Sequence, residues 1–352
     1  MSHDGDFLPW QTAQAQSWLQ HRERFAHAWL IHGLRGIGQL EFALAGARSL
    51  LCETPQDGLA CGHCQACRWV DAGNHPDLRR IRPDVIAQHE GSEVSEGEEG
   101  GGSKKKQPSR DIRIEQIRAL LPWFNVATHR AGWRVAILYP AERLNVVSAN
   151  ALLKVLEEPP EHTVFLIVAD APDRLLPTLV SRCRRLPLPV PSRSEAEQWL
   201  KAQGIADAGV WLDAVGGAPM LAVERAAGGV PAYPPWLDDF LDLCRRDGDA
   251  GPLADQLAAM PTADWIDGFQ RMMTDLSLAA HNAPVRYFPS RAQAIQAVAT
   301  AADRRRLASA ARWLLTQRRL SGQALNPKFL ADHGVSLLTQ ACRPAAHDTE
   351  AS

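Results

Sequence analysis

The fold is decided by the stretch AWLIHGLRGIGQL, residues 28–40. Residues 28–32 are a short apolar run typical of a buried strand, and residues 33–38 form a glycine-rich turn. Apolar side chains then recur at helical spacing at Leu40, Leu44 and Leu51. The stretch therefore predicts a strand, a tight turn and a helix, which together make one unit of an α/β sheet.

Strand and helix patterns alternate on the C-terminal side of this unit. Helix 146–158 is expected to end before Pro159-Pro160, because a residue that precedes proline is pushed out of the helical region. Alternating strands and helices imply a parallel sheet covered on both faces. We predict buried strands at 134–139 and 163–169, an edge strand at 186–188, and helices at 112–122, 146–158 and 175–181.

Beyond Pro191 the strand pattern is absent and the chain reads as helical. Ser194 and Glu197 have the spacing of a capping box at the start of a helix over 194–203. The turn at 216–219 marks another helix start, and the prolines between 231 and 235 indicate a linker. We therefore predict three domains: an α/β domain at 1–188, a small helical domain at 189–230 and a larger helical domain at 231–345.

Composition excludes several classes of protein. The 352 residues are 45% hydrophobic and 22% charged, with a net charge of −2. Such a chain is neither largely disordered nor fibrous, and any contact with nucleic acid must come from a local patch or from partners. The longest aliphatic run, at 164–169, is far shorter than the about 20 residues of a membrane span, and the acidic start is no secretory signal, so we expect a cytoplasmic protein. The Glu- and Gly-rich segment 88–109 is expected to be a disordered, solvated loop.

The glycine turn has the shape of a phosphate loop without its reactive groups. The pattern G-x-x-x-x-G-K-[ST] uses lysine at the phosphates and a hydroxyl on Mg²⁺. Gly33 and Gly38 frame the loop and Gly36 lies within it, but Gln39 and Leu40 replace the lysine and the hydroxyl residue. The acidic pair expected after a neighbouring strand is also missing. Tyr139-Pro140 follow that strand, and Glu142 is expected to be misplaced.

Four cysteines form a candidate metal site with the spacing Cys52-x8-Cys61-x2-Cys64-x2-Cys67. Four thiolates can make a closed tetrahedral Zn²⁺ site, which leaves no open position for catalysis, so His63 and His75 are not needed. An iron–sulfur cluster is the alternative, but its C-x2-C-x2-C run requires a fourth cysteine followed by proline, and residue 71 is aspartate.

Three motifs carry a resemblance to a known family. They are NALLKVLEEPP at 150–160, Phe165-Leu166, and Ser181-Arg182-Cys183. Together they resemble the clamp-loader branch of the AAA+ ATPases, from His27 to about Leu221 and more weakly through NPKFL at 326–330. The resemblance implies an AAA+ domain, a helical lid and a helical collar for the three predicted domains, and it also implies zinc at the cysteines.

Within that branch, this chain resembles the subunits that do not hydrolyse ATP. Hydrolysing subunits carry a threonine where Ala169 and Asp170 align, and a nucleotide-sensing arginine where Pro219 aligns. Together with Gln39 and the missing acidic pair, four nucleotide contacts are absent. The resemblance therefore implies an empty phosphate loop and no intrinsic catalysis.

Arg182 is the reactive group that the resemblance retains. The resemblance implies that Arg182 is an arginine finger directed at ATP on the adjacent gamma/tau subunit. The guanidinium of such a finger stabilises charge on the transferring phosphoryl group. Ser181 is expected to orient the segment, and Cys183 to pack in the core.

The implied role is that of a stator in the bacterial DNA polymerase III clamp loader, a component of the DNA-directed DNA polymerase holoenzyme. Its partners would be the gamma/tau and delta subunits, the sliding beta clamp and primer–template DNA. DNA contact would be with backbone phosphate, for which Arg143 and Lys154 are candidates, although both also suit a solvated face. The alternatives are a nucleotide-binding or active ATPase of the same family, and a zinc-dependent DNA-binding module.

Overall fold

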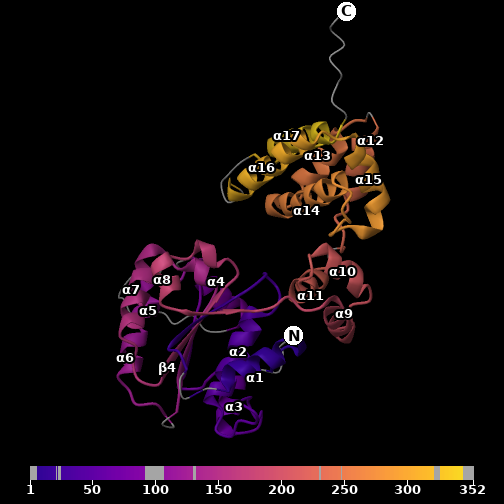
Figure 1. Ribbon diagram of the computed structural model, residues 1–352. Helices are drawn as coiled ribbons and strands as arrows, with labels where there is room; N and C mark the ends of the chain where they lie inside the picture. The colour runs from indigo at the N-terminus through magenta and orange to yellow at the C-terminus, as the bar shows by residue number, and fades with distance from the viewer. Residues whose placement is uncertain are drawn as a thin grey trace, which may run out of the picture. The chain divides into compact units, whose positions relative to one another are not determined.

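The structure is a computed structural model in which the chain divides into two compact units, Met1–Glu195 and Ala196–Ser352. Figure 1 shows the helices and strands of the units, and each unit has its own hydrophobic core. The structure describes residues 6–20, 22, 25–91, 107–129, 132–229, 231–246, 248–320 and 326–343.

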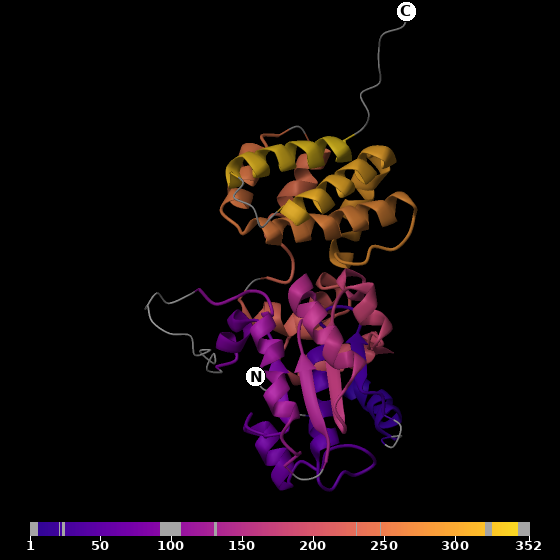
Figure 2. The same ribbon diagram turned by 90° about the vertical axis from the view of Figure 1, so that its left-hand side faces the viewer.

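The first unit is built on a five-stranded parallel sheet, whose strands run side by side in Figure 2. The strand order is β2-β3-β4-β1-β5, which places β2 and β5 at the edges. The predicted strands at 134–139 and 163–169 and the edge strand are confirmed, whereas β2 was not predicted. The strands are β1 (Ala28–His32), β2 (Leu78–Ile81), β3 (Arg134–Leu138), β4 (Thr163–Ala169) and β5 (Arg184–Pro187).

Alternate residues of each strand point to opposite faces of this sheet, and helices cover both faces. Trp29 and Ile31 of β1 join a core with α1 and α2, while Leu30 joins a second core with α5, α7 and α8. This is the AAA+ fold class that the resemblance implies. The helices of the unit are η1 (Pro9–Gln11), α1 (Thr12–Leu19), α2 (Gln39–Leu51), α3 (Gln65–Asp71), α4 (Asp84–His89), α5 (Ile114–Arg118), α6 (Leu120–Phe124), η3 (Ala141–Arg143), α7 (Val146–Glu157), η4 (Pro172–Arg174) and α8 (Pro177–Ser181).

Two predictions for this unit need correction. The helix expected at 112–122 is two short helices, and Pro122 lies in the first turn of α6, where its missing N–H is not needed. The disordered loop expected at 88–109 is wrong for residues 88 and 89, which belong to α4. Glu90 is also fixed, since it pairs with Arg82 at 2.8 Å and accepts a hydrogen bond from the Tyr139 hydroxyl at 2.7 Å. Residues 92–106 lie outside the described residues.

Helices are the regular elements of the second unit in the part that the structure describes, as predicted. Its core is centred on aromatic side chains, with Trp236 stacked on Phe269 at 4.0 Å between ring centroids. The first helix, which spans the boundary between the units, is capped by Ser192 and Glu195 rather than by Ser194 and Glu197. The helices are α9 (Arg193–Ala202), α10 (Ala208–Ala214), α11 (Pro219–Ala227), α12 (Leu237–Arg245), α13 (Gly251–Ala258), α14 (Thr262–Ala280), η5 (Pro289–Arg291), α15 (Ala292–Ala301), α16 (Arg304–Leu320) and α17 (Pro327–Cys342).

Ion pairs and hydrogen bonds join the predicted lid segment to α14 within the second unit. Arg225 of α11 pairs with Asp267 at 2.8 Å, and the Arg271 guanidinium donates a hydrogen bond to the carbonyl of Ala214. The two helical domains predicted at 189–230 and 231–345 therefore contact each other, and their division at 230 stays a prediction.

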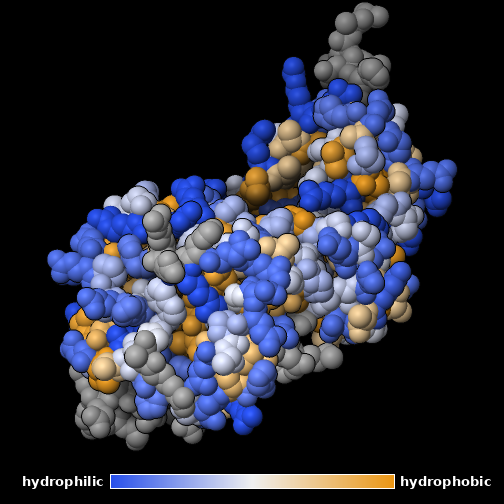
Figure 3. All heavy atoms as spheres, turned by 60° about the horizontal axis from the view of Figure 1, so that its bottom comes forward, coloured by the Kyte–Doolittle hydropathy of each residue, from blue (hydrophilic) through white to orange (hydrophobic). Residues whose placement is uncertain are grey.

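Hydrophilic residues predominate on the face in Figure 3, with apolar residues in patches among them. Among the described residues, no helix has the combination of length and apolar composition that crossing a bilayer requires.

Candidate functional site

The glycine-rich loop at residues 33–38 follows β1 and is held by hydrogen bonds from the N-terminal segment. Gly36 and Gly38 have φ angles of 83° and 95°, which glycine adopts without strain. Trp10 Nε1 donates a hydrogen bond to the Ile37 carbonyl at 3.0 Å, and Gln11 Nε2 donates one to the Gly38 carbonyl at 2.7 Å. A Cβ at Gly38 would clash with Leu8. The loop shape predicted from its glycines is therefore present and is packed against residues 8–11.

The side chain of Gln39 forms hydrogen bonds across the loop. Its amide nitrogen lies 3.1 Å from the Gly33 carbonyl oxygen, 2.9 Å from that of Leu34 and 3.1 Å from Asp170 Oδ1. The amide carries two hydrogens, which these three acceptors share. Only 4% of the residue is exposed. The donor at the position of the missing lysine is therefore directed at the protein itself.

Two carboxylates lie beside this loop at the carboxyl edge of the sheet. Asp170 follows β4, and burial and the nearby Glu142 carboxylate both raise the pKa of Asp170. Arg35, 3.9 Å from Asp170, opposes that shift. Glu142 was expected to be misplaced, but η3 brings it to the same edge, where its Oε1 accepts the Ala171 N–H at 2.5 Å. One carboxylate oxygen of Glu142 thus accepts a backbone hydrogen bond. Asp170 and Glu142 together add negative charge beside the loop.

Tyr139 follows β3 at the position where an acidic pair was sought. It is 3% exposed and donates its hydroxyl hydrogen to Glu90. Burial and that hydrogen bond raise the pKa of Tyr139 above its ordinary value. Its hydroxyl therefore stays protonated at neutral pH, so the residue is neither a base nor a metal ligand.

Arg182 lies at the end of α8, with its side chain about one-third exposed. Its Nη1 donates a hydrogen bond to the Thr178 carbonyl at 3.1 Å, and its Nη2 lies 2.5 Å from Oε1 of Glu157 at the end of α7. The Ser181 hydroxyl donates a hydrogen bond to the same Thr178 carbonyl. The guanidinium is thus held at the surface of its own chain.

Cys183, the next residue, is buried in the core of the first unit. Burial raises the pKa of its thiol to about 12, so the thiol is protonated at neutral pH. It donates a hydrogen bond to the Leu179 carbonyl at 3.2 Å. A protonated, buried thiol packs but does not act as a nucleophile.

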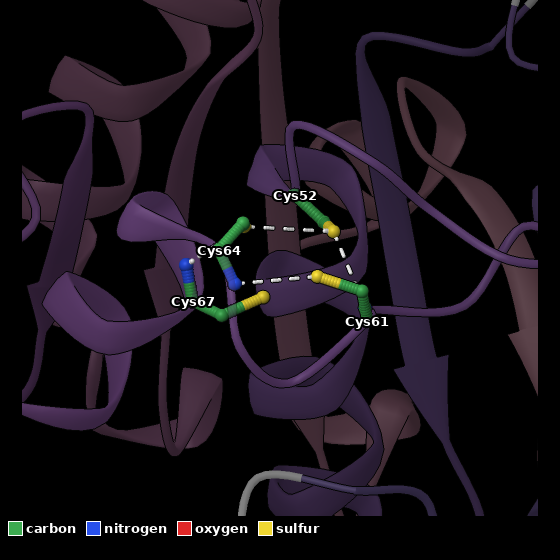
Figure 4. Close-up of side chains that lie close together, drawn as sticks. All are labelled: Cys52, Cys61, Cys64 and Cys67. Carbon is green, nitrogen blue, oxygen red and sulfur yellow. Dashed lines mark hydrogen bonds between the residues drawn. The ribbon is translucent and has the colours of Figure 1, made fainter.

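The four cysteines of the predicted metal site gather at one place, as Figure 4 shows. Their sulfurs all lie within 4.8 Å of one another, and Cys52 Sγ is 3.9 Å from Cys64 Sγ. A tetrahedral site with Zn–S bonds near 2.3 Å separates its sulfurs by about 3.8 Å. The arrangement therefore fits a metal such as zinc.

Local turns hold these ligands in place. Cys52 ends α2 and Cys64 caps the start of α3, while backbone N–H groups donate to the sulfurs of Cys52, Cys61 and Cys64. The Thr54 hydroxyl donates to Cys61 Sγ, and this bond with backbone N–H groups lowers the pKa of Cys61 to about 5. Thiolate is the form that binds metal. His63 and His75 are not among the clustered ligands, as the sequence predicted.

Arg48 is a residue of this region that the sequence analysis missed. It lies on α2, the helix that starts at the phosphate loop and ends at Cys52. Only 5% of it is exposed, and its guanidinium pairs with Asp71 at 2.8 Å and with Asp6 at 2.9 Å. Asp71 ends α3, so Arg48 ties α2 to the helix that Cys64 caps and that contains Cys67. An arginine on an otherwise apolar helix face was the available signal.

Comparison with known proteins decides the family. Residues 11–192, just over half of the chain, match the family described as "DNA polymerase III, delta subunit". DNA polymerase III subunit delta' of Pseudomonas aeruginosa is 33% identical over 270 residues, which are 75% of each chain. The chain belongs to the delta-prime family of DNA polymerase III clamp-loader subunits. Subunit delta' of Escherichia coli K12 is 34% identical over 177 residues, which are 50% of this chain and 46% of that protein.

Similarity also extends beyond the delta-prime family. Subunit tau of Escherichia coli K12 is 33% identical over 160 residues, which are 46% of this chain and 21% of tau. A crystal structure of a gamma subunit-related protein from Thermotoga maritima superimposes with a TM-score of 0.43 and 17% identity, over 95% of this chain and 100% of that one.

Proposed function

We propose that this chain is the delta-prime stator of a clamp loader that places the sliding beta clamp on primed DNA. Its partners are gamma/tau and delta subunits, and it reaches primer–template DNA through the complex. It hydrolyses no ATP, and it supplies Arg182 to an ATP site on the adjacent gamma/tau subunit. Membership of the delta-prime family and similarity to tau support this assignment.

The observation that carries the proposal is the position of the Gln39 amide. An ATP-hydrolysing loop needs a cation that projects toward the β and γ phosphates. Here both amide hydrogens are directed at the loop carbonyls and Asp170. The carboxylates of Asp170 and Glu142 would also repel a polyphosphate at the loop. The guanidinium of Arg35, beside Asp170, would offset part of that repulsion. The chain therefore contributes to ATP hydrolysis only through a group given to a neighbour.

Arg182 suits that contribution by its chemistry and its setting. Guanidinium is always charged and presents a planar fork to phosphate oxygens. Its side chain reaches solvent, and its partner Glu157 is half exposed, so the guanidinium can exchange that partner for a phosphate at low cost.

The four cysteines hold structural Zn²⁺ in this proposal. Zinc would supply a crosslink between the end of α2 and α3, with all four positions taken by thiolates. Arg48 then adds positive charge near an anionic metal–thiolate centre.

The test is ATP turnover by a loader reconstituted with gamma/tau, delta, the beta clamp and primed DNA. Arg182→Ala should lower the stimulated turnover, because an arginine finger is worth about 10³–10⁵ in rate at the site it completes. Arg174→Ala, which removes an exposed arginine from η4, is the matched control and should leave turnover unchanged. Equal turnover by native protein and Arg182→Ala would contradict the proposal. Labelled ATP should not bind at the phosphate loop of the isolated chain, and saturable binding that Arg35→Ala, beside that loop, weakens would favour the nucleotide-binding alternative.

A further inference from the structure

A cleft of about 610 Å³ lies between the first turns of α16 and the last turns of α17. It belongs to the second unit, whereas Arg182 and the phosphate loop belong to the first. Its polar lining consists of Arg305, Arg306, Ser309, Gln340 and Arg343. Leu337 and alanine side chains supply an apolar floor.

The charge of the cleft is strongly positive. Helix α16 carries arginines in its first and last turns and contains no acidic residue. Asp303 precedes the helix, and its carboxylate accepts the backbone N–H groups of Arg305 and Arg306 at 2.8 and 3.0 Å and so caps the helix. The guanidinium-bearing side chains of Arg305, Arg306 and Arg343 therefore line the cleft together.

The cleft is partly pre-organised. Arg343 Nη2 donates to the carbonyls of Leu243 and Arg246 at 3.3 and 3.2 Å, which anchors its guanidinium beside α12. Arg312, one turn further along α16, donates to the Ser309 hydroxyl at 2.9 Å. Arg305 and Arg306 are exposed and free to turn toward a ligand.

We propose that this cleft binds a phosphate group of a nucleotide unit, either within a nucleic-acid strand or in a free nucleoside polyphosphate. Guanidinium forks match phosphate oxygens, and they do so best when several converge on one site. The apolar floor suits the sugar or base attached to that phosphate, and the volume is in the range of small-ligand sites.

The experiment measures binding to the full chain by fluorescence anisotropy, with a labelled oligothymidylate and labelled ATP as separate probes and with tripolyphosphate as a competitor of each. The test variant combines Arg305→Gln and Arg306→Gln. The control combines Arg318→Gln and Arg319→Gln, which remove the same charge from the other end of α16, about 20 Å away at 1.5 Å per residue. Thermal unfolding of both variants checks that the fold is kept.

In a single strand, each phosphate contact contributes about 0.7 to the slope of log affinity against log salt, so the test variant should lower that slope by about 1.4. Loss of oligothymidylate binding in the test variant alone assigns the cleft to a nucleic-acid strand. Binding of labelled ATP but not of oligothymidylate, displaced by tripolyphosphate and lost in the same variant, assigns it to a free nucleotide. Absence of binding to every probe, or equal loss in the control variant, would overturn the proposal.

Discussion

Arg182 Nη2 lies 2.5 Å from Glu157 Oε1, so the Ser-Arg-Cys motif and the LEEPP motif are joined by an ion pair. The two side chains are 36% and 50% exposed. An exposed pair of this kind contributes about 0–1 kcal/mol to stability. The pair therefore positions the arginine without making the fold depend on it.

Arg182→Ala should accordingly change the free energy of unfolding by less than about 1 kcal/mol. Urea denaturation of the isolated chain measures it. Glu157→Gln, which removes the charge but keeps the length of the partner, should have a similarly small effect. A loss of several kcal/mol in either variant would show that the motif is structural, and a fall in ATP turnover could then not be assigned to a finger.

Arg48→Met should be more damaging than Arg182→Ala, although both remove a guanidinium. Arg48 is buried and pairs with Asp71, so its loss removes a charged hydrogen bond worth about 1.5–3 kcal/mol, while the pair with the exposed Asp6 adds at most about 1 kcal/mol. Methionine keeps most of the volume, so the loss reports on charge. Urea denaturation followed by tryptophan fluorescence is a suitable measurement, and an effect no larger than that of Arg182→Ala would contradict the expectation.

Gln39→Leu should lower stability by about 1–3 kcal/mol, because the Gly33 and Leu34 carbonyls lose their side-chain donor while side-chain volume is kept. Gln14→Leu is the matched control. The Gln14 amide donates a single exposed hydrogen bond, to the Pro187 carbonyl, and its loss should cost less. Denaturant midpoints of the two variants compare them directly, and equal midpoints would mean that the Gln39 amide does not hold the loop closed.

Asp170→Asn should stabilise the protein at neutral pH more than in acid. Burial and the Glu142 carboxylate raise the folded-state pKa of Asp170 above its unfolded value, near 3.9. The contribution of Asp170 to stability is therefore full below the unfolded pKa and is lost as pH rises through the folded pKa. Asparagine does not ionise, so the variant does not lose this stability as pH rises. Its side-chain oxygen can still accept a hydrogen bond from the Gln39 amide. Urea unfolding of both proteins between pH 4 and pH 7 tests this, and a difference that does not vary with pH would refute it.

Local sequence patterns predicted the elements that depend on local chemistry. The β1 strand and its glycine turn, β3 and β4 are apolar runs with clear boundaries. Strand β2 was missed because two of its residues are arginines, one of which, Arg79, lies over the Trp123 ring at 5.1 Å. Only the tertiary structure supplies that aromatic partner.

The position of a helix cap shows a second limit of prediction from the sequence. The segment SRSEAE at 192–197 contains two overlapping S-x-x-E patterns, and sequence alone does not choose between Ser192 and Ser194. The structure uses Ser192 with Glu195. Arg48 was missed for a related reason, since its partners Asp6 and Asp71 are distant in sequence.

At the candidate site, residue types were predicted but their contacts were not. The absence of lysine at position 39 was evident, whereas the inward direction of the Gln39 amide depends on Asp170, which a different strand supplies. Glu142 could not be placed because η3 turns it back toward the end of β4. The clustering of the four cysteines was predicted, because the spacing typical of metal-binding cysteines is local in the sequence.

Cys61→Ser should abolish binding of one Zn²⁺ per chain and destabilise the first unit. All four thiolates are needed to close a tetrahedral site, and binding of structural metal is part of the folding free energy. Cys183→Ser is the matched control. It alters a buried thiol that hydrogen-bonds to Leu179 and lies outside the cluster, so it should leave metal content unchanged.

Metal analysis by mass spectrometry gives the stoichiometry, and thermal unfolding with and without a chelator gives the stabilisation. Because the cysteines lie in the first unit, chelation should lower an unfolding transition of that unit and leave the helical second unit unchanged. Iron in place of zinc would support the iron–sulfur alternative. Native protein without metal, or equal metal content in native protein and Cys61→Ser, would show that the cluster is not a metal site.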